Sequence, residues 1–233
     1  MNATNCRNCK RPVAENFCPQ CGAKAAVPAI TLHVIFHEAF HYFTHLDKGF
    51  GYTLKKLITQ PGTMQREYID GDRSMHQKPF SMFFLCGTIS GLGYYFINVA
   101  SGKIYGSHDP TSEDFFRHYF ILLQAALLPL YTLVTWLFFK NQKYSYAETL
   151  IMMLYNLAFV FLVLVPIVSL NLVFPNFENR IVEVMFLLFY NLATNFHFYK
   201  GHKGLIVVQT ILAIAVCYAL SQVFSEWARM LLH

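Results

Sequence analysis

The last two-thirds of the chain, after Lys78, consists of long stretches without a charged residue, separated by short charged segments. The charge-free stretches lie between Lys78 and Lys103, Arg117 and Lys140, Glu148 and Glu178, Glu183 and Lys200, and Lys203 and Glu226. A helix needs about 20 apolar residues to cross the hydrocarbon core of a bilayer, because each residue advances it by about 1.5 Å. The pattern therefore predicts five membrane-spanning helices, at about residues 80–100, 119–139, 149–170, 181–199 and 204–224.

The fourth predicted span is short and carries several polar side chains. Glu183, Tyr190, Thr194 and His197 fall on one stripe of this helix when residues are placed at intervals of 100°. Polar groups at membrane depth cost on the order of a few kcal/mol each, so they usually face other helices or a cavity. The stripe is a candidate polar path for a small carrier or channel. The alternative is that its ends are interface residues flanking a short span.

Upstream of the spans, residues 31–46 follow the period of an amphipathic helix. His33, His37, His41 and His45 occupy the arc opposite its apolar residues. This predicts a helix lying in the plane of the membrane surface, with an imidazole face that gains charge below about pH 6.5.

The same helix contains the pattern H-E-x-x-H, from His37 through Glu38 to His41. In metalloproteases this pattern places two imidazoles on zinc beside a general-base glutamate. A catalytic zinc needs a third ligand, and none follows at the usual distance; His45 is the nearest candidate, and His76 is another if the chain folds back. A membrane metalloenzyme is therefore kept as an alternative, and no catalytic residue is assigned.

Four cysteines near the N-terminus form the pattern C-x2-C-x8-C-x2-C, at Cys6, Cys9, Cys18 and Cys21. Each pair brings two thiolates round a tight turn onto one tetrahedral ion, for which Zn²⁺ is the usual occupant, although iron accepts the same donors. A segment of about twenty residues cannot bury a core, so a structural metal would provide most of its stability. The pattern predicts a zinc ribbon. With four protein ligands its coordination is closed, which favours a structural or docking role.

Composition supports the membrane interpretation. Hydrophobic residues make up 55% of the chain and charged residues only 13%, and the mean hydropathy is +0.36, which excludes an ordinary soluble domain. The first thirty residues lack an apolar stretch long enough for a cleavable signal peptide.

The distribution of charge predicts an orientation. With the N-terminus inside, the inner segments carry fourteen Lys and Arg and the outer segments carry four. The positive-inside rule then places the N-terminus in the cytoplasm and the C-terminus in the periplasm, as expected for a bacterial inner-membrane protein. The net charge of +5 comes mainly from the N-terminal part. A basic segment next to a bilayer is attracted to anionic lipid headgroups, so no nucleic-acid partner is expected, whereas a protein partner or a homo-oligomer is compatible with the sequence.

Residues 53–73, between the predicted surface helix and the first span, predict a helix, a turn at Pro61-Gly62, a second helix and a glycine stop at Gly71. This segment resembles a bacterial family of uncharacterised membrane proteins with a zinc ribbon, a T-L-x-x-L…P-G-x-x-x-R-E-Y-I-x-G-x-R segment and several transmembrane helices. The matching residues are Thr53, Leu54, Leu57, Pro61, Gly62, Arg66, Glu67, Tyr68, Ile69, Gly71 and Arg73. The resemblance continues at Tyr146-Ala147-Glu148 and at residues 189–193. It implies an architecture and carries no activity.

Four polar residues of this segment are candidates for a contact with lipid phosphate or with a partner: Arg66, Glu67, Tyr68 and Arg73. Glu67 could instead pair with Arg73. The alternative is a solvated surface helix whose charges keep it out of the lipid.

The sequence thus predicts an all-α protein: a zinc ribbon at residues 1–27, amphipathic cytoplasmic helices and a linker at residues 28–79, and a transmembrane bundle of about five spans at residues 80–233. The predicted function is non-enzymatic, with a zinc-stabilised cytoplasmic head that docks a partner or senses the membrane surface.

Overall fold

The computed structural model describes residues 4–6, 11–13, 17–22, 49–105, 112–174 and 177–232. Its elements are β1 (Thr4–Asn5), β2 (Pro12–Val13), α2 (Phe50–Thr59), α3 (Pro61–Asp70), α4 (Pro79–Tyr105), α5 (Ser112–Phe138), α6 (Tyr146–Ser169), the 3-10 helix η1 (Leu170–Leu172), α7 (Asn179–Phe198) and α8 (Lys203–Leu232). The predicted surface helix at residues 31–46 lies outside the described residues.

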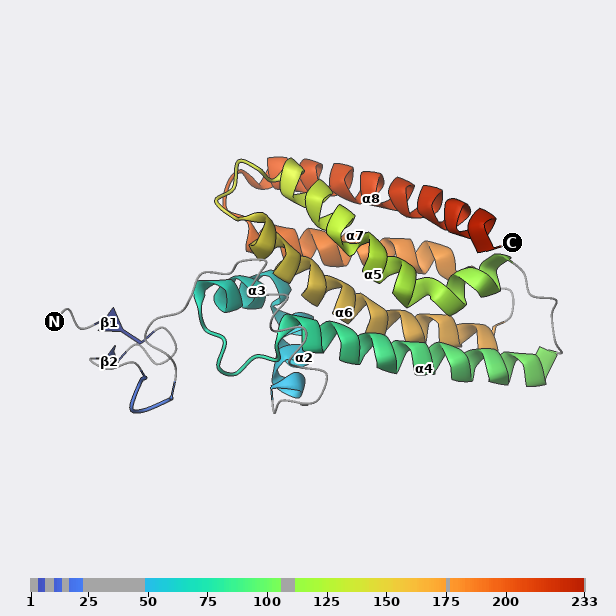
Figure 1. The fold of residues 1–233 in the computed structure, drawn as a ribbon, viewed down its shortest axis with the longest axis horizontal. Coiled ribbons are helices and arrows are strands. Elements are labelled where there is room, and N and C mark those ends of the chain that lie inside the picture. The colour runs from blue at the N-terminus through green and yellow to red at the C-terminus, as the bar shows by residue number, and fades with distance from the viewer. Residues whose placement is uncertain are drawn as a thin grey trace.

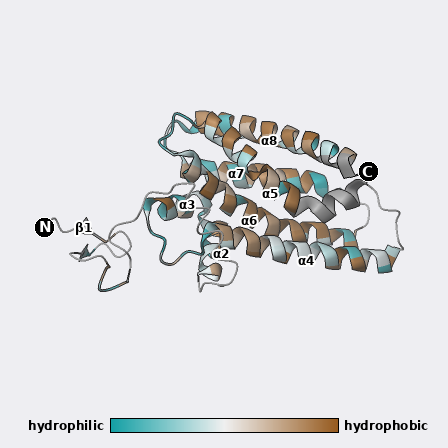
Figure 2. Cartoon of the chain, viewed as in Figure 1, coloured by the Kyte–Doolittle hydropathy of each residue, from teal (hydrophilic) through white to brown (hydrophobic). Residues whose placement is uncertain are grey.

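The five long helices run side by side in alternating directions, and the short helices α2 and α3 lie at one end of this bundle (Figure 1). We call the end of the bundle where the consecutive short helices α2 and α3 lie the hairpin end. Helices α4, α6 and α8 begin there, and the C-terminus lies at the opposite end. Apolar residues predominate along the long helices, and the connections at the hairpin end are hydrophilic (Figure 2). The prediction of an all-α helical bundle is confirmed.

Four of the described helices are long and apolar enough to cross a bilayer. They are Pro79–Tyr105, Tyr146–Leu172, Asn179–Phe198 and Lys203–Phe224. The remaining predicted span coincides with α5, where the apolar stretch within the described side chains is Leu122–Phe138 and is shorter. The protein is therefore a membrane protein by the length and composition of its helices.

Helix α6 is the central element of the bundle. In its most apolar stretch 67% of the residues are buried, against 33% in α4 and 17% in α8, and it contacts α4, α5 and α7. It begins with a capping box, in which the Ser145 side chain accepts the Glu148 N–H and Glu148 accepts the Ser145 N–H. On its α4 side, Ser90 Oγ donates to the Phe161 carbonyl (2.7 Å), and a Cβ on Gly93 would lie 2.7 Å from Val165. Small residues thus let α4 and α6 approach closely, as is usual between helices in membranes.

Candidate functional site

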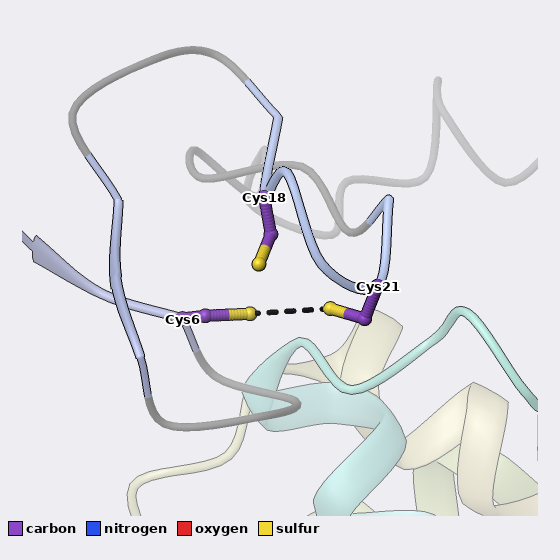
Figure 3. Close-up of side chains that lie close together, drawn as sticks. All are labelled: Cys6, Cys18 and Cys21. Atoms are coloured by element: carbon purple, nitrogen blue, oxygen red, sulfur yellow. Dashed lines mark hydrogen bonds between the residues drawn. The ribbon is translucent and has the colours of Figure 1, made fainter.

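The N-terminal cysteines lie on a small antiparallel ladder and a tight turn. Strand β1 pairs with β2, with Thr4 opposite Val13, and the Cys6 N–H next to this ladder donates to the Arg11 carbonyl (2.7 Å). The tight turn lies at residues 18–22, where the Gly22 N–H donates to the Cys18 carbonyl (2.9 Å). Gly22 has a φ of +69°, which favours glycine. Both segments present their thiols to the same space (Figure 3).

The sulfur atoms of Cys6, Cys18 and Cys21 all lie within 4.8 Å of one another, and Cys6 Sγ lies 3.6 Å from Cys21 Sγ. This separation is far longer than the roughly 2.05 Å of a disulfide. It is close to the roughly 3.8 Å expected between two thiolates on a tetrahedral ion with metal–sulfur bonds of about 2.3 Å. The three cysteines are therefore close enough to hold one metal ion. Cys9, the fourth predicted ligand, lies outside the described residues.

The alternative metal site cannot be placed in the same way, because His33, His37, Glu38, His41 and His45 lie outside the described residues. His76, the proposed distant third ligand, lies in the connection between α3 and α4 and is buried, with 5% of its surface exposed.

Residues 49–79, from α2 to the start of α4, pack on the hairpin end of the bundle, and we call this segment the clasp. Thr53 in α2 accepts the Gln77 N–H (2.7 Å), and the Gln77 carbonyl accepts the hydroxyl of Tyr155 in α6. Gly49 lets the connection pass closely, because a Cβ there would lie 2.7 Å from the Met75 carbonyl oxygen. Gln77, just before α4, thus connects α2 to α6.

Helix α3 ends at the predicted glycine stop, but it begins at Pro61, so the predicted turn at Pro61-Gly62 is the first turn of the helix, and one side of the helix is buried. Pro61 occupies its first turn, and Gly71 ends it in the left-handed conformation with a φ of +114°. Gly62 packs directly on α7: a Cβ there would lie 2.1 Å from the Thr194 carbonyl oxygen and 2.7 Å from the Phe198 nitrogen. One face of α3 is therefore part of the bundle interior.

A chain of three amides, two of them buried, joins α3 to the membrane helices α6 and α7. Gln65 is fully buried and its Nε2 donates to Asn156 Oδ1 in α6 (2.8 Å). Asn156 Nδ2 donates in turn to Asn191 Oδ1 in α7 (3.3 Å). Neither Gln65 nor Asn156 was among the predicted site residues. The signal for Asn156 in the sequence was an amide inside the apolar stretch of the third span, which needs a partner at membrane depth.

The predicted polar contact residues of α3 and of the turn after it have different environments. Tyr68 is buried, with its ring 5.6 Å from that of Tyr155 in an edge-on arrangement. Arg73 donates from Nε to the Tyr68 carbonyl (3.1 Å), and its guanidinium lies 5.6 Å from the Tyr68 ring centroid. Both residues thus hold the clasp together. Arg66 and Glu67 are half-buried, and they stay candidates for an external contact.

The polar stripe of α7 is in part covered by the clasp. The Tyr190 hydroxyl donates to the Leu57 carbonyl of α2 (3.4 Å), and Thr194 lies under Gly62. At the ends of the stripe, Glu183 is half-buried, whereas His197 is exposed and its Nδ1 lies 2.8 Å from the Ala193 carbonyl oxygen. The middle of the stripe therefore has a packing role.

His76 gives the clasp a sensitivity to acid. Its ring lies 5.2 Å from the ring of Tyr52 and 6.3 Å from that of Tyr68, and no described group bonds to its buried Nδ1. Burial lowers the pKa of His76 below its usual 6.5; Glu67 opposes this effect and Lys56 adds to it. Because the unfolded chain then binds more protons than the folded one, the stability that His76 contributes decreases as the pH falls below 6.5.

We therefore expect the unfolding temperature of the protein to fall on acidification, in the interval from about pH 6.5 to pH 5. His76→Phe keeps an aromatic ring between the two tyrosines but cannot titrate, so its unfolding temperature should fall less over the same interval. Identical pH profiles for the two proteins, measured by thermal unfolding in detergent, would show that His76 does not contribute.

Comparison with known proteins bears on this same segment. Residues 47–91 match the model of DUF3667, a family of proteins of unknown function. The DUF3667 match therefore includes the clasp and the first half of α4. It agrees with the resemblance to a family of unknown function, whereas the zinc ribbon and the sequence motif of that resemblance stay predictions. The matched residues do not include the four N-terminal cysteines. No curated protein and no solved structure matches the chain.

Proposed function

We propose that the protein is a non-enzymatic membrane protein in which a zinc-stabilised head docks a partner at the membrane surface. The observation that carries this proposal is the convergence of Cys6, Cys18 and Cys21 within 4.8 Å. The fourth thiolate, from Cys9, would complete a tetrahedral set that Zn²⁺ prefers.

A site with four protein ligands has no open position for water or substrate. It therefore stabilises a small fold and presents its surface, and it does not activate a nucleophile. Further along the chain the clasp is fixed to the bundle, since Gly62, Gln65 and Tyr68 are buried. A partner bound to the head would thus be held at the hairpin end.

We further propose that the hairpin end faces the cytoplasm, in a bacterial inner membrane. The connections there carry Lys140, Lys143 and Lys200, and α8 begins there with Lys203, in addition to the basic N-terminal part. Positive residues in short connections remain on the cytoplasmic side during insertion. With five spans the C-terminus would then lie in the periplasm.

The experiment that tests a docking head against a metalloenzyme is a count of bound metal. Purified full-length protein should contain one zinc per chain by elemental analysis. His37→Ala combined with His41→Ala should leave this content unchanged, because two imidazoles without a third ligand bind zinc far more weakly than four thiolates. A second equivalent of zinc that disappears in the histidine variant would instead support the enzyme hypothesis.

A further inference from the structure

Two turns at the hairpin end bring four lysines to the surface. The turn between α5 and α6 carries Lys140 and Lys143, the turn between α7 and α8 carries Lys200, and Lys203 directly after that turn is the first residue of α8. All four side chains are exposed. We call the surface that they form the lysine surface.

Direct contacts hold the two turns together. The Phe139 ring stacks on the Tyr199 ring, with 3.9 Å between centroids and 5° between planes, and both rings are buried. The Tyr144 hydroxyl donates to the Phe198 carbonyl (3.5 Å). A Cβ on Gly201 would lie 3.5 Å from Gln142 Nε2. The aromatic contacts therefore keep the lysines of both turns in one group.

Few acidic groups neutralise this surface. Residues 139–147 and 199–206 contain no Asp or Glu. The first acidic residue after Lys143 in the sequence is Glu148. Its carboxylate is hydrogen-bonded at the start of α6, where it accepts the Ser145 N–H (2.7 Å) and the Ser145 hydroxyl (2.9 Å). Two further charges close to Tyr144, those of Asp70 and Arg66 on α3, have opposite signs. The surface thus keeps a net positive charge.

The lysine surface adjoins apolar side chains that face the bilayer. Leu137 at the end of α5 is 52% exposed, and Leu205 at the start of α8 is 55% exposed. Lys203 lies between the lysine surface and these apolar side chains: its Nζ donates to the Phe196 carbonyl and lies 4.1 Å from the centroid of the Phe196 ring. A phospholipid has the matching chemistry, with apolar chains on one side of an anionic phosphate.

We propose that the lysine surface binds the headgroup of an anionic phospholipid. Lys140, Lys143 and Lys200 contact the phosphate region, and the acyl chains lie along α5 and α8. Clusters of lysine next to the ends of membrane helices attract anionic lipids in this way. The inference does not depend on the metal-binding head, so either can fail without the other.

The test uses full-length protein in a zwitterionic detergent, to which phosphatidylglycerol or phosphatidylcholine is added. Phosphatidylglycerol should raise the unfolding temperature at a lower concentration than phosphatidylcholine, since a ligand that binds the folded state stabilises it. The double variant Lys140→Gln with Lys200→Gln removes one charge from each turn and spares Lys203. Its apparent affinity for phosphatidylglycerol should be roughly 30-fold weaker.

Two matched variants give the controls. Lys103→Gln with Arg180→Gln removes two exposed charges at the opposite end of the bundle and should leave the affinity unchanged. Lys140→Arg with Lys200→Arg retains the charges and should retain binding. Equal weakening in both glutamine variants would overturn the proposal, because it would indicate only general attraction. Full competition by inorganic phosphate would also overturn it, in favour of a free-anion site.

Discussion

Replacing Gly62 by Ala is expected to detach α3 from the bundle. The new Cβ would lie 2.1 Å from the Thr194 carbonyl oxygen and 2.7 Å from the Phe198 nitrogen, and both are backbone atoms of α7. Backbone cannot rotate away as a flexible side chain can, so α3 must move. Overpacking an interior usually costs roughly 1–3 kcal/mol, and a clash between backbones belongs at or above the upper end of that range.

Loss of this contact should also expose the amide chain beneath it, because Gln65 lies one turn beyond Gly62 on the same helix. We expect a large drop in the unfolding temperature in detergent, together with faster hydrogen exchange in residues 61–70. The matched control is Gly51→Ala in α2, where nothing lies within 4 Å of the added Cβ. That variant should gain about 0.5–1 kcal/mol, as alanine does in an exposed helix. A Gly62→Ala protein as stable as Gly51→Ala would contradict the packing described for α3.

Replacing Cys18 and Cys21 by Ser is expected to abolish metal binding and to unfold the head. These residues provide half of the predicted thiolate set, and hydroxyl groups do not replace thiolates on zinc. Structural zinc contributes on the order of 10 kcal/mol to the folding of such small segments, which have no core of their own. The variant should contain no zinc by elemental analysis. Limited proteolysis should then cleave within the first thirty residues and leave the bundle intact.

Cys217→Ser is the control for this experiment. Cys217 lies in α8, far along the chain from the head, and is only partly buried. Its replacement should leave the metal content and the protease resistance of the head unchanged. A Cys18 and Cys21 variant that retains one zinc per chain would show that the metal is held elsewhere.

The features that the sequence determined by itself depend on local chemistry. The positions of the apolar stretches within the long helices follow from the spacing of charged residues, because a charge is costly in the hydrocarbon region whatever its neighbours are. The bounds of α3 follow from Pro61, which suits a first turn, and from Gly71, which adopts a φ of +114° that other residues avoid. The cysteine spacing likewise restricts the head, since a pair two residues apart can reach one ion only through a tight turn.

Only the tertiary structure decided which polar residues are buried. In sequence, Gln65 resembles a surface residue of a short polar helix, yet it is fully buried because Asn156 offers it a partner. Gly62 could equally have marked a flexible turn; its close approach to Thr194 depends on where α7 lies. Arg73 is near enough in sequence to pair with Glu67, but it bonds the Tyr68 carbonyl instead. In each case the environment of the side chain is provided by residues distant in sequence, or by a loop conformation, and local patterns contain no information about either.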